Sequence, residues 1–135
     1  MALDTVEEAN ARFYRAFEAL DLRAMDEVWG HGAHVKCVHP GWPLLTGWEA
    51  VRASWEAIFA NTQEMSFTLT DVRVTEAGDL AWVTCTENIL SESDGRVGVT
   101  SILATNVFER GPGREGGGWR MVHHHASHVL GRAGS

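Results

Sequence analysis

Residues 80–110 read LAWVTCTENILSESDGRVGVTSILATNVFER, and this stretch decides the fold. It contains two long runs of strand-forming residues, 80–91 and 96–110, separated by the turn signal Ser93-Asp94-Gly95. Strands joined by so short a connection pair with each other as an antiparallel hairpin. The stretch therefore predicts the centre of an antiparallel sheet.

A further strand is predicted before this hairpin, because the hydrophobic period there is two. Phe67 and Leu69 alternate with polar residues, whereas Val72 and Val74 continue on the opposite parity. Such a change of phase predicts a β-bulge where it occurs, near residues 70–71.

The last predicted strand, residues 119–128, follows a glycine-rich loop over 111–118 and reads WRMVHHHASH. Alternation along the strand would place one set of side chains on a common face: Trp119, Met121, His123 and His125. We expect this face to line the interior, because Arg120 on the other face is costly to bury without a partner. The opposite alignment would instead turn Val122 and His124 inward.

The N-terminal half predicts three amphipathic helices from apolar residues at helical spacing. Their ranges are 6–20, 22–29 and 48–59. Asp4, with Glu7 three residues later, is typical of a capping box at the first helix. A short strand is predicted over 33–38, and the proline- and glycine-containing segment 39–43 must be a loop.

The predicted order of elements is therefore α-α-β-α-β-β-β-β. Helices with one apolar stripe must bury it, so the three helices are expected to cover one face of the antiparallel meander. Bulged strands curl a sheet, and a curled sheet covered by helices encloses a concave interior. We predict an α+β fold with this architecture.

The composition limits the class of protein. The 135 residues are 44% hydrophobic and 21% charged, with a formal net charge of −7, which is typical of one soluble globular domain over 1–135. The negative charge disfavours nucleic acid as a partner. The chain has no apolar run long enough to cross a membrane, and residues 1–8 do not resemble a signal peptide, so we expect a cytoplasmic protein. Cys37 and Cys85 are then expected to be buried thiols.

Histidine and asparagine side chains are the main candidates for chemistry. His39 ends a predicted strand before a proline loop, and a histidine with an ordinary pKa is partly neutral at pH 7 and serves as a general base. His123 and His125 would bind a substrate oxygen or relay a proton. Asn106, between Ala104 and Phe108 on one strand face, is able to donate to a carbonyl oxygen.

Other residues are candidates for substrate binding. Trp42, in the proline loop, and Trp55, on the third predicted helix, would form an aromatic mouth and lining. Glu87 would act as an acid or base if burial raises its pKa, or it faces solvent on the other side of its strand. A zinc site of His39, His123, His125 and Glu87 has acceptable spacing, but buried histidines with polar partners are commoner, so we predict no metal.

Several local patterns resemble the NTF2-like superfamily, in particular its SnoaL-like and ketosteroid isomerase-like branch. They are Phe13-Tyr14 through Trp29, the loop His39-Pro40-Gly41, Thr46-Gly47-Trp48-Glu49-Ala50-Val51, Thr105-Asn106-Val107-Phe108 and the closing segment 118–127. The resemblance implies a cone-shaped α+β barrel with one deep pocket for a small molecule, and a homodimer formed through the outer face of the sheet.

Three positions depart from the ketosteroid isomerases that the chain resembles. His39 stands where those enzymes have a base aspartate, and Asn106 stands in place of a second acid. Phe13, lining the pocket, occupies the place of their oxyanion-binding tyrosine, and Tyr14 is one residue away, about 100° around the helix. Steroid isomerisation by that mechanism is therefore not expected.

Two functions remain open from the sequence. One is cofactor-independent acid/base catalysis on a hydrophobic, oxygenated small molecule by an isomerase, cyclase, dehydratase or hydrolase, with His39 as base and His123, His125 and Asn106 polarising the substrate oxygen. The chain has no nucleophile elbow, phosphate loop or dinucleotide fingerprint, so no cofactor is predicted. The alternative is a non-catalytic ligand-binding or dimerisation domain.

Overall fold

A computed structural model describes residues 5–111 and 118–129. It contains three helices, α1 (Val6–Glu18), α2 (Leu22–Val28) and α3 (Trp48–Ala60). Six strands form one sheet: β1 (Lys36–Val38), β2 (Leu45–Thr46), β3 (Glu64–Ala77), β4 (Leu80–Ser93), β5 (Arg96–Arg110) and β6 (Trp119–His128). Most of the predicted loop over 111–118 lies outside the described residues.

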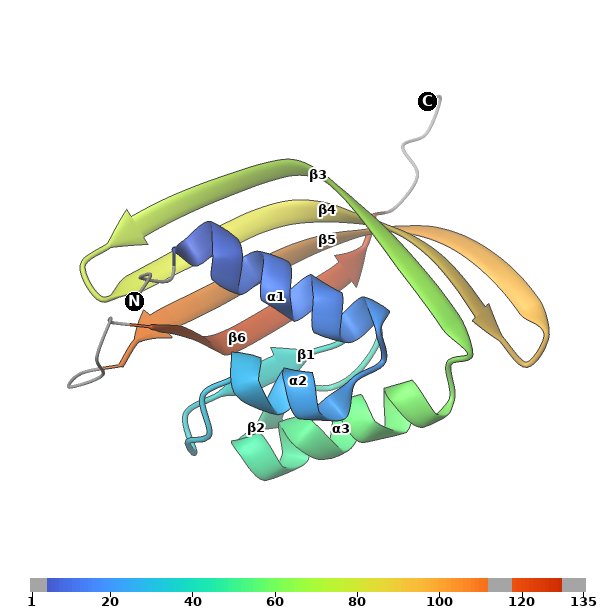
Figure 1. Cartoon of the computed structure of the whole chain (residues 1–135), viewed down its shortest axis with the longest axis horizontal. Helices are drawn as coiled ribbons and strands as arrows, with labels where there is room; N and C mark the ends of the chain where they lie inside the picture. Colours follow the sequence, from blue (N-terminus) through green and yellow to red (C-terminus); the bar gives the residue numbers. More distant parts are fainter. Residues whose placement is uncertain (1–4, 112–117, 130–135) are drawn as a thin grey trace.

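The strand order in the sheet is β2-β1-β6-β5-β4-β3. Every neighbouring pair is antiparallel except β1 and β6, which run parallel. The sheet is strongly curved, and α1 lies in its concavity while α2 and α3 lie beside the β1–β2 end (Figure 1). The predicted α+β architecture is confirmed, with the short strand β2 added. The sheet remains open, with β2 and β3 at its edges, and is not a closed barrel.

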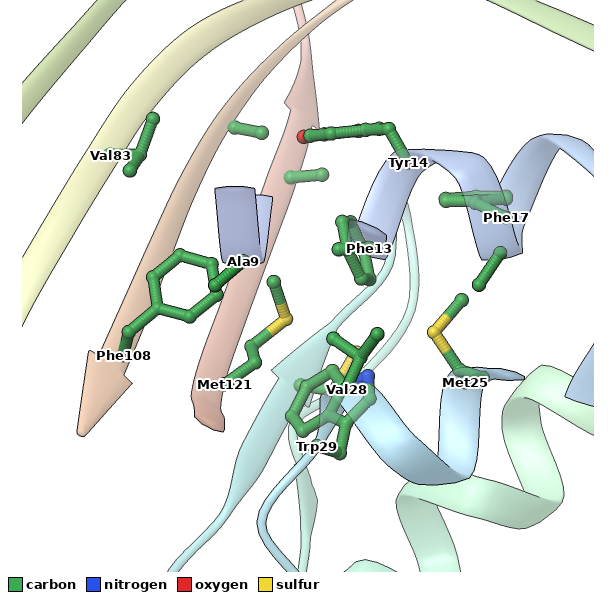
Figure 2. Packing of buried hydrophobic residues seen from close by; sticks show 14 of the residues in the cluster. Ala9, Phe13, Tyr14, Phe17, Met25, Val28, Trp29, Val83, Phe108 and Met121 are labelled. Carbon is green, nitrogen blue, oxygen red and sulfur yellow. The ribbon is translucent and has the colours of Figure 1, made fainter. Parts of the chain in front are cut away.

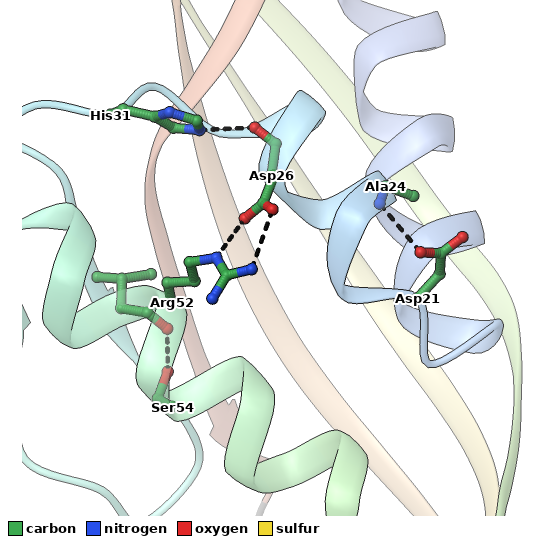
Figure 3. A network of polar contacts seen from close by, with 7 residues as sticks. Asp21, Ala24, Asp26, His31, Arg52 and Ser54 are labelled. Atoms are coloured by element: carbon green, nitrogen blue, oxygen red, sulfur yellow. Dashed lines mark hydrogen bonds and ion pairs between the residues drawn. The ribbon is translucent and has the colours of Figure 1, made fainter.

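The three helices begin at the predicted residues, and only the cap of the first helix differs from the prediction, by one position. The cap of α1 is Thr5, whose hydroxyl accepts from the Glu8 amide while the Glu8 carboxylate accepts from the Thr5 amide. This is the predicted capping box moved along by one position, and Asp4 lies outside the described residues. Helix α2 is attached to α3 by the ion pair of Asp26 with Arg52 (Figure 3). The Arg52 guanidinium donates to the two carboxylate oxygens of Asp26 at 2.7 and 3.2 Å.

Two β-bulges shape the long strands. The predicted one is confirmed by a register shift between Thr70 and Arg73 on β3. The second was not predicted and lies on β6, where Val107 pairs with His123 but the next residue, Phe108, pairs with Met121. Val122 is thus an extra residue, and an extra residue reverses which side chains face inward beyond it.

The core is aromatic and lies between α1 and the sheet (Figure 2). The Phe13 ring is near its centre and contacts the rings of Phe17, Trp29 and Trp55 edge-on at 5.8, 6.5 and 5.6 Å between centroids. Edge-to-face packing of this kind stabilises a core beyond the area it buries. A rigid aromatic wall therefore surrounds the polar groups described next.

Candidate functional site

Six polar side chains are buried within this apolar core. They are Asn10 on α1, His39 after β1, Ser54 on α3, Glu87 on β4, Asn106 on β5 and His124 on β6. Buried polar groups are costly unless they are hydrogen-bonded, and each of these has a partner. Five separate elements and one loop bring them together, so the cluster exists only in the folded chain.

The first part of the cluster is a chain of hydrogen bonds from Glu87 to His124. The Tyr14 hydroxyl donates to the Glu87 carboxylate at 2.5 Å. The Asn106 amide donates to the Tyr14 oxygen at 3.1 Å and to the Asn10 carbonyl oxygen at 2.9 Å. Its own carbonyl oxygen lies 2.6 Å from Nδ1 of His124. One carboxyl, one phenol, two amides and one imidazole thus form a continuous buried network.

The second part is centred on His39. Nε2 of His39 lies 2.8 Å from the Ser54 hydroxyl, which in turn donates to the Val51 carbonyl at 2.6 Å. The thiol of Cys37, two residues earlier on β1, lies 3.5 Å from the same nitrogen. His39 is therefore held by a neighbouring helix and by its own strand.

The two parts meet at the rings of His39 and His124. Their centroids are 6.3 Å apart, and both rings contact Trp55, at 4.7 and 5.9 Å. Trp42 contacts His39 edge-on at 4.9 Å and is 40% exposed, so it connects the cluster with solvent. The loop that carries Trp42 includes Gly41 at φ +82°, a left-handed conformation that favours glycine.

Burial sets the charge of these groups. It lowers the pKa of His39 from 6.5 to about 4, and it lowers the pKa of His124 well below its ordinary value, with the neighbouring histidines adding to the effect. Burial raises the pKa of Glu87 from 4.5 to about 7, and the hydrogen bond from Tyr14 opposes that rise. At pH 7 both imidazoles are therefore neutral, while Glu87 is half protonated.

The structure brings together most of the residues that the sequence singled out. His39, Asn106, Glu87, Phe13 and Trp55 are all buried in this region, and Trp42 lies at its exposed side. Of the two positions open for Glu87, the inward one is found. The two cysteines are buried free thiols, as predicted.

The predicted inward face of the last strand is wrong for His123 and His125. The prediction holds for Trp119 and Met121, but the bulge at Val122 reverses the alternation. His124 is therefore buried, at 1% exposure, while His123 is half-buried and His125 is exposed. The rings of these two lie 6.2 Å apart on the outer face of the sheet, away from His39's network.

Three buried polar positions were not predicted from the sequence: those of Asn10, Ser54 and Tyr14. Tyr14 follows Phe13 directly, yet the buried side of α1 is wide enough to include both. Its place in the sequence could have indicated this, because Tyr14 is the one tyrosine of the chain and directly follows Phe13, which was expected to face inward. Nothing in the sequence marks Asn10 or Ser54 as buried, because polar residues of an amphipathic helix usually lie on its solvent-exposed face.

The asparagine does not have the role that the sequence suggested for it. Both ends of the Asn106 amide are occupied by protein groups, since its nitrogen donates to Asn10 and Tyr14 and its oxygen accepts from His124. It therefore orients His124. Within residues 5–111 and 118–129, no group of three histidine, cysteine, aspartate or glutamate side chains is arranged to hold a metal ion.

The chain belongs to the family of SnoaL-like domains, whose model matches residues 6–131. Among solved structures, it is similar to a protein of Streptomyces avermitilis named a "putative dehydratase from the NTF2-like family". The two are 44% identical with a TM-score of 0.85, over 93% of this chain and 94% of that one. The predicted membership of the NTF2-like superfamily is thus confirmed.

The chain is also similar to two proteins whose names do not include a dehydratase activity. A protein of Thiobacillus denitrificans named a "putative calcium/calmodulin-dependent protein kinase type II association domain" is 35% identical, with a TM-score of 0.82, over 96% of this chain and 99% of that one. The F-box protein SKIP8 of Arabidopsis thaliana is 36% identical over 121 residues. That match covers 90% of this chain, which spans about half the length of the plant protein, 48%.

The described helices give no sign of a membrane span. None of them is both long enough and apolar enough to cross a bilayer.

Proposed function

We propose that this protein binds a hydrophobic, oxygenated small molecule beside His39 and carries out cofactor-independent acid/base chemistry on it. The observation that carries the proposal is the meeting of His39 and His124, from separate parts of the fold, at 6.3 Å against Trp55. Uncharged imidazoles in an apolar surrounding offer lone pairs that accept protons or hydrogen bonds.

His39 is the proton acceptor in this proposal. A pKa of about 4 leaves it neutral over the whole physiological range, and burial excludes competing water. Glu87, with a pKa of about 7, is available in both protonation states and communicates with the same network through Tyr14. Groups whose surroundings push their pKa values apart in opposite directions are typical of acid/base sites.

The ligand class follows from the walls of the site. The rings of Phe13 and Trp55, both fully buried, pack against the ring of His124, at 4.9 and 5.9 Å between centroids. An apolar body with few polar groups fits such a lining. The proposed entrance is the side of Trp42, which is the exposed aromatic residue in contact with His39.

The Streptomyces protein gives independent support for an enzyme, because its name includes "dehydratase" and its identity to this chain is 44%. Dehydration is one of the four reaction types that the site would serve, beside isomerisation, cyclisation and hydrolysis. The two buried thiols support a cytoplasmic location for this proposed enzyme, because reducing compartments keep cysteines free.

A second proposed function is assembly through the outer face of the sheet. That face carries exposed apolar side chains on β4 and β5: Trp82, Leu90, Val97, Val99 and Leu103. Val99 is 82% exposed and pairs with exposed Leu90 on the neighbouring strand, and exposed apolar side chains that lie together are typical of an interface. We propose a homodimer through this face, in line with the word "association" in the name of the Thiobacillus relative.

Nuclear magnetic resonance of the seven histidine rings tests the acid/base proposal. The rings are titrated with and without a small set of polyaromatic and steroid-like ketones. We expect the signals of His39 and His124 to change with ligand, and those of His123 and His125, on the outer face, to stay unchanged as internal controls.

The variants H39Q and H125Q form a matched pair for the same experiment. The first removes a buried proton acceptor, and the second changes an exposed ring on the neighbouring strand. Loss of ligand response in H39Q alone supports the proposal. A response that is equal in both variants, or absent from all seven histidines of the parent chain, contradicts it.

A further inference from the structure

We infer that the site between His39 and His124 is a hydrogen-bond acceptor, so that its ligand presents a hydroxyl group to it rather than an anionic oxygen. The inference rests on the proposed function and deepens it by naming the polar group of the substrate. Hydrogen-bond directions in the two parts of the network carry the argument.

Ser54 determines which partner donates in its hydrogen bond with His39. The Ser54 oxygen lies 2.6 Å from the Val51 carbonyl oxygen, a contact that Figure 3 shows within α3. A carbonyl oxygen only accepts, so the single hydroxyl proton of Ser54 must lie between these two oxygens. Nε2 of His39, 2.8 Å from the Ser54 oxygen, therefore donates, and the lone pair of the neutral ring is on Nδ1. The partner nearest to Nδ1 is the Cys37 thiol, a weak donor whose sulfur lies 3.9 Å from it.

Asn106 determines which partner donates in its hydrogen bond with His124. The amide nitrogen of Asn106 points at two oxygens, those of Asn10 and Tyr14, to which it donates at 2.9 and 3.1 Å. The carbonyl oxygen of Asn106 consequently faces His124, and Nδ1 of that ring donates to it at 2.6 Å. The lone pair of neutral His124 is therefore on Nε2. The two histidines have opposite tautomers, and each has its donating nitrogen bound to protein.

A donor without a partner among the described residues belongs to a side chain that packs against both rings. The indole nitrogen of Trp55 is buried and, within the described part of the chain, has no hydrogen-bond partner. Trp55 contacts both His39 and His124. Two lone pairs and one N–H are complementary to a hydroxyl group, which donates one hydrogen bond and accepts another. A ketone matches only the N–H of this set.

An anionic ligand would find no counter-charge. The buried polar and charged side chains of the described residues are two asparagines, two histidines, one serine and one glutamate, with no lysine or arginine among them. An ionised Glu87 would repel a carboxylate, and burying an unpaired charge is among the costliest events in a protein. The site therefore favours a neutral alcohol.

The first test reads the tautomers directly. Long-range proton–nitrogen correlation spectra of the full chain at pH 7.5 distinguish protonated from unprotonated ring nitrogens. We expect a protonated Nε2 at His39 and a protonated Nδ1 at His124. A protonated Nε2 at His124, or a protonated Nδ1 at His39, would place a donor in the site and overturn the inference.

The second test compares three probes that share one apolar body: 1-tetralol, 1-tetralone and tetralin-1-carboxylate. We expect the alcohol to bind about tenfold more tightly than the ketone, and the carboxylate to give no response, since a group left without its hydrogen-bond partner commonly loses that factor. The chemical shifts of His39 and His124 report the binding.

Ser54 offers the matched variants. S54A releases Nε2 of His39 and is expected to reduce the preference for alcohol to less than about threefold, whereas S54T keeps the hydroxyl and the preference. Equal or tighter binding of the ketone to the parent chain overturns the inference and leaves the proposed function in place. If none of the three probes shifts either ring, both the inference and the proposed function are wrong.

Discussion

Tyr14 on α1 lies with its hydroxyl 2.5 Å from the carboxylate of Glu87 on β4, and this contact links the helix to the sheet. Both side chains are buried, Glu87 at 2% exposure. Because a buried carboxyl resists ionisation, the contact has consequences for stability as well as for chemistry.

The variant E87Q is expected to gain stability relative to the parent at high pH. The folded-state pKa of Glu87, about 7, lies above its ordinary 4.5, so the folded parent loses stability as pH rises from 4.5 through 7. The full effect is about 3 kcal/mol, from 1.36 kcal/mol per pKa unit. Urea unfolding at pH 5 and pH 8 measures it, with E76Q on the exposed part of β3 as the control. An equal difference between E87Q and parent at both values would contradict this.

The variant H39Q is expected to resist acid better than the parent. Burial holds the folded-state pKa of His39 at about 4, below its ordinary 6.5, so the unfolded chain binds more protons between these values and the parent loses stability as pH falls through that window. The loss that H39Q avoids is about 3 kcal/mol when the pH reaches 4. Thermal unfolding from pH 7 to pH 4 tests this, with exposed H125Q as the control. A parallel decline of H39Q and parent would count against it.

Removing the Tyr14 hydroxyl should weaken the whole network. Y14F deletes the hydrogen bonds to Glu87 and from Asn106, which should cost about 1–3 kcal/mol of unfolding free energy because buried partners are left unsatisfied. The pKa of Glu87 should rise further, since the bond from Tyr14 holds it down. Carboxyl titration by carbon-13 resonance checks the second point, and an unchanged Glu87 pKa would show that the contact is not formed in solution.

A single charged substitution on the outer face of the sheet is expected to disrupt the proposed dimer. V99E, at the most exposed of these apolar side chains, should convert the proposed dimer to monomers, because an unpaired charge in an apolar interface is strongly unfavourable. Light scattering after size-exclusion chromatography measures the mass. V72E, also at an exposed valine but on β3 near the bulge, is the control and should keep the dimer. A monomeric parent chain would refute the proposal.

Deleting Val122 should remove the bulge and leave His124 inward. Without the extra residue, strict alternation from Met121 places His123 on the outer face and His124 on the inner face, which are the faces that they occupy in the parent. We therefore expect the contact of His124 with Asn106 and the titration of its ring to be kept. Hydrogen exchange along β6 and the histidine titration together measure this, and a solvent-accessible His124 ring in the variant would contradict it.

The class of the fold was predictable from local patterns in the amino-acid sequence. Residues 80–110 contain a hairpin signal between two long strands, and the amphipathic periods before them place three helices on one side of the sheet. These are local signals, because turn residues and side-chain periods act over a few positions. For the same reason the bulge near Thr70 was predictable from a visible change of hydrophobic phase.

Which histidine of β6 faces inward depends on how the strands pair in the folded sheet. No local pattern marks Val122 as an extra residue. An apolar residue precedes it and three histidines follow it, so the sequence is compatible with either set of histidine side chains facing inward. The bulge forms through pairing with β5, over a dozen residues away in the chain. Its result is that His124, and not His123 or His125, meets Asn106, Tyr14 and Glu87 in the core, because a strand's alternation of faces is set by its neighbour's register as well as by its own residues.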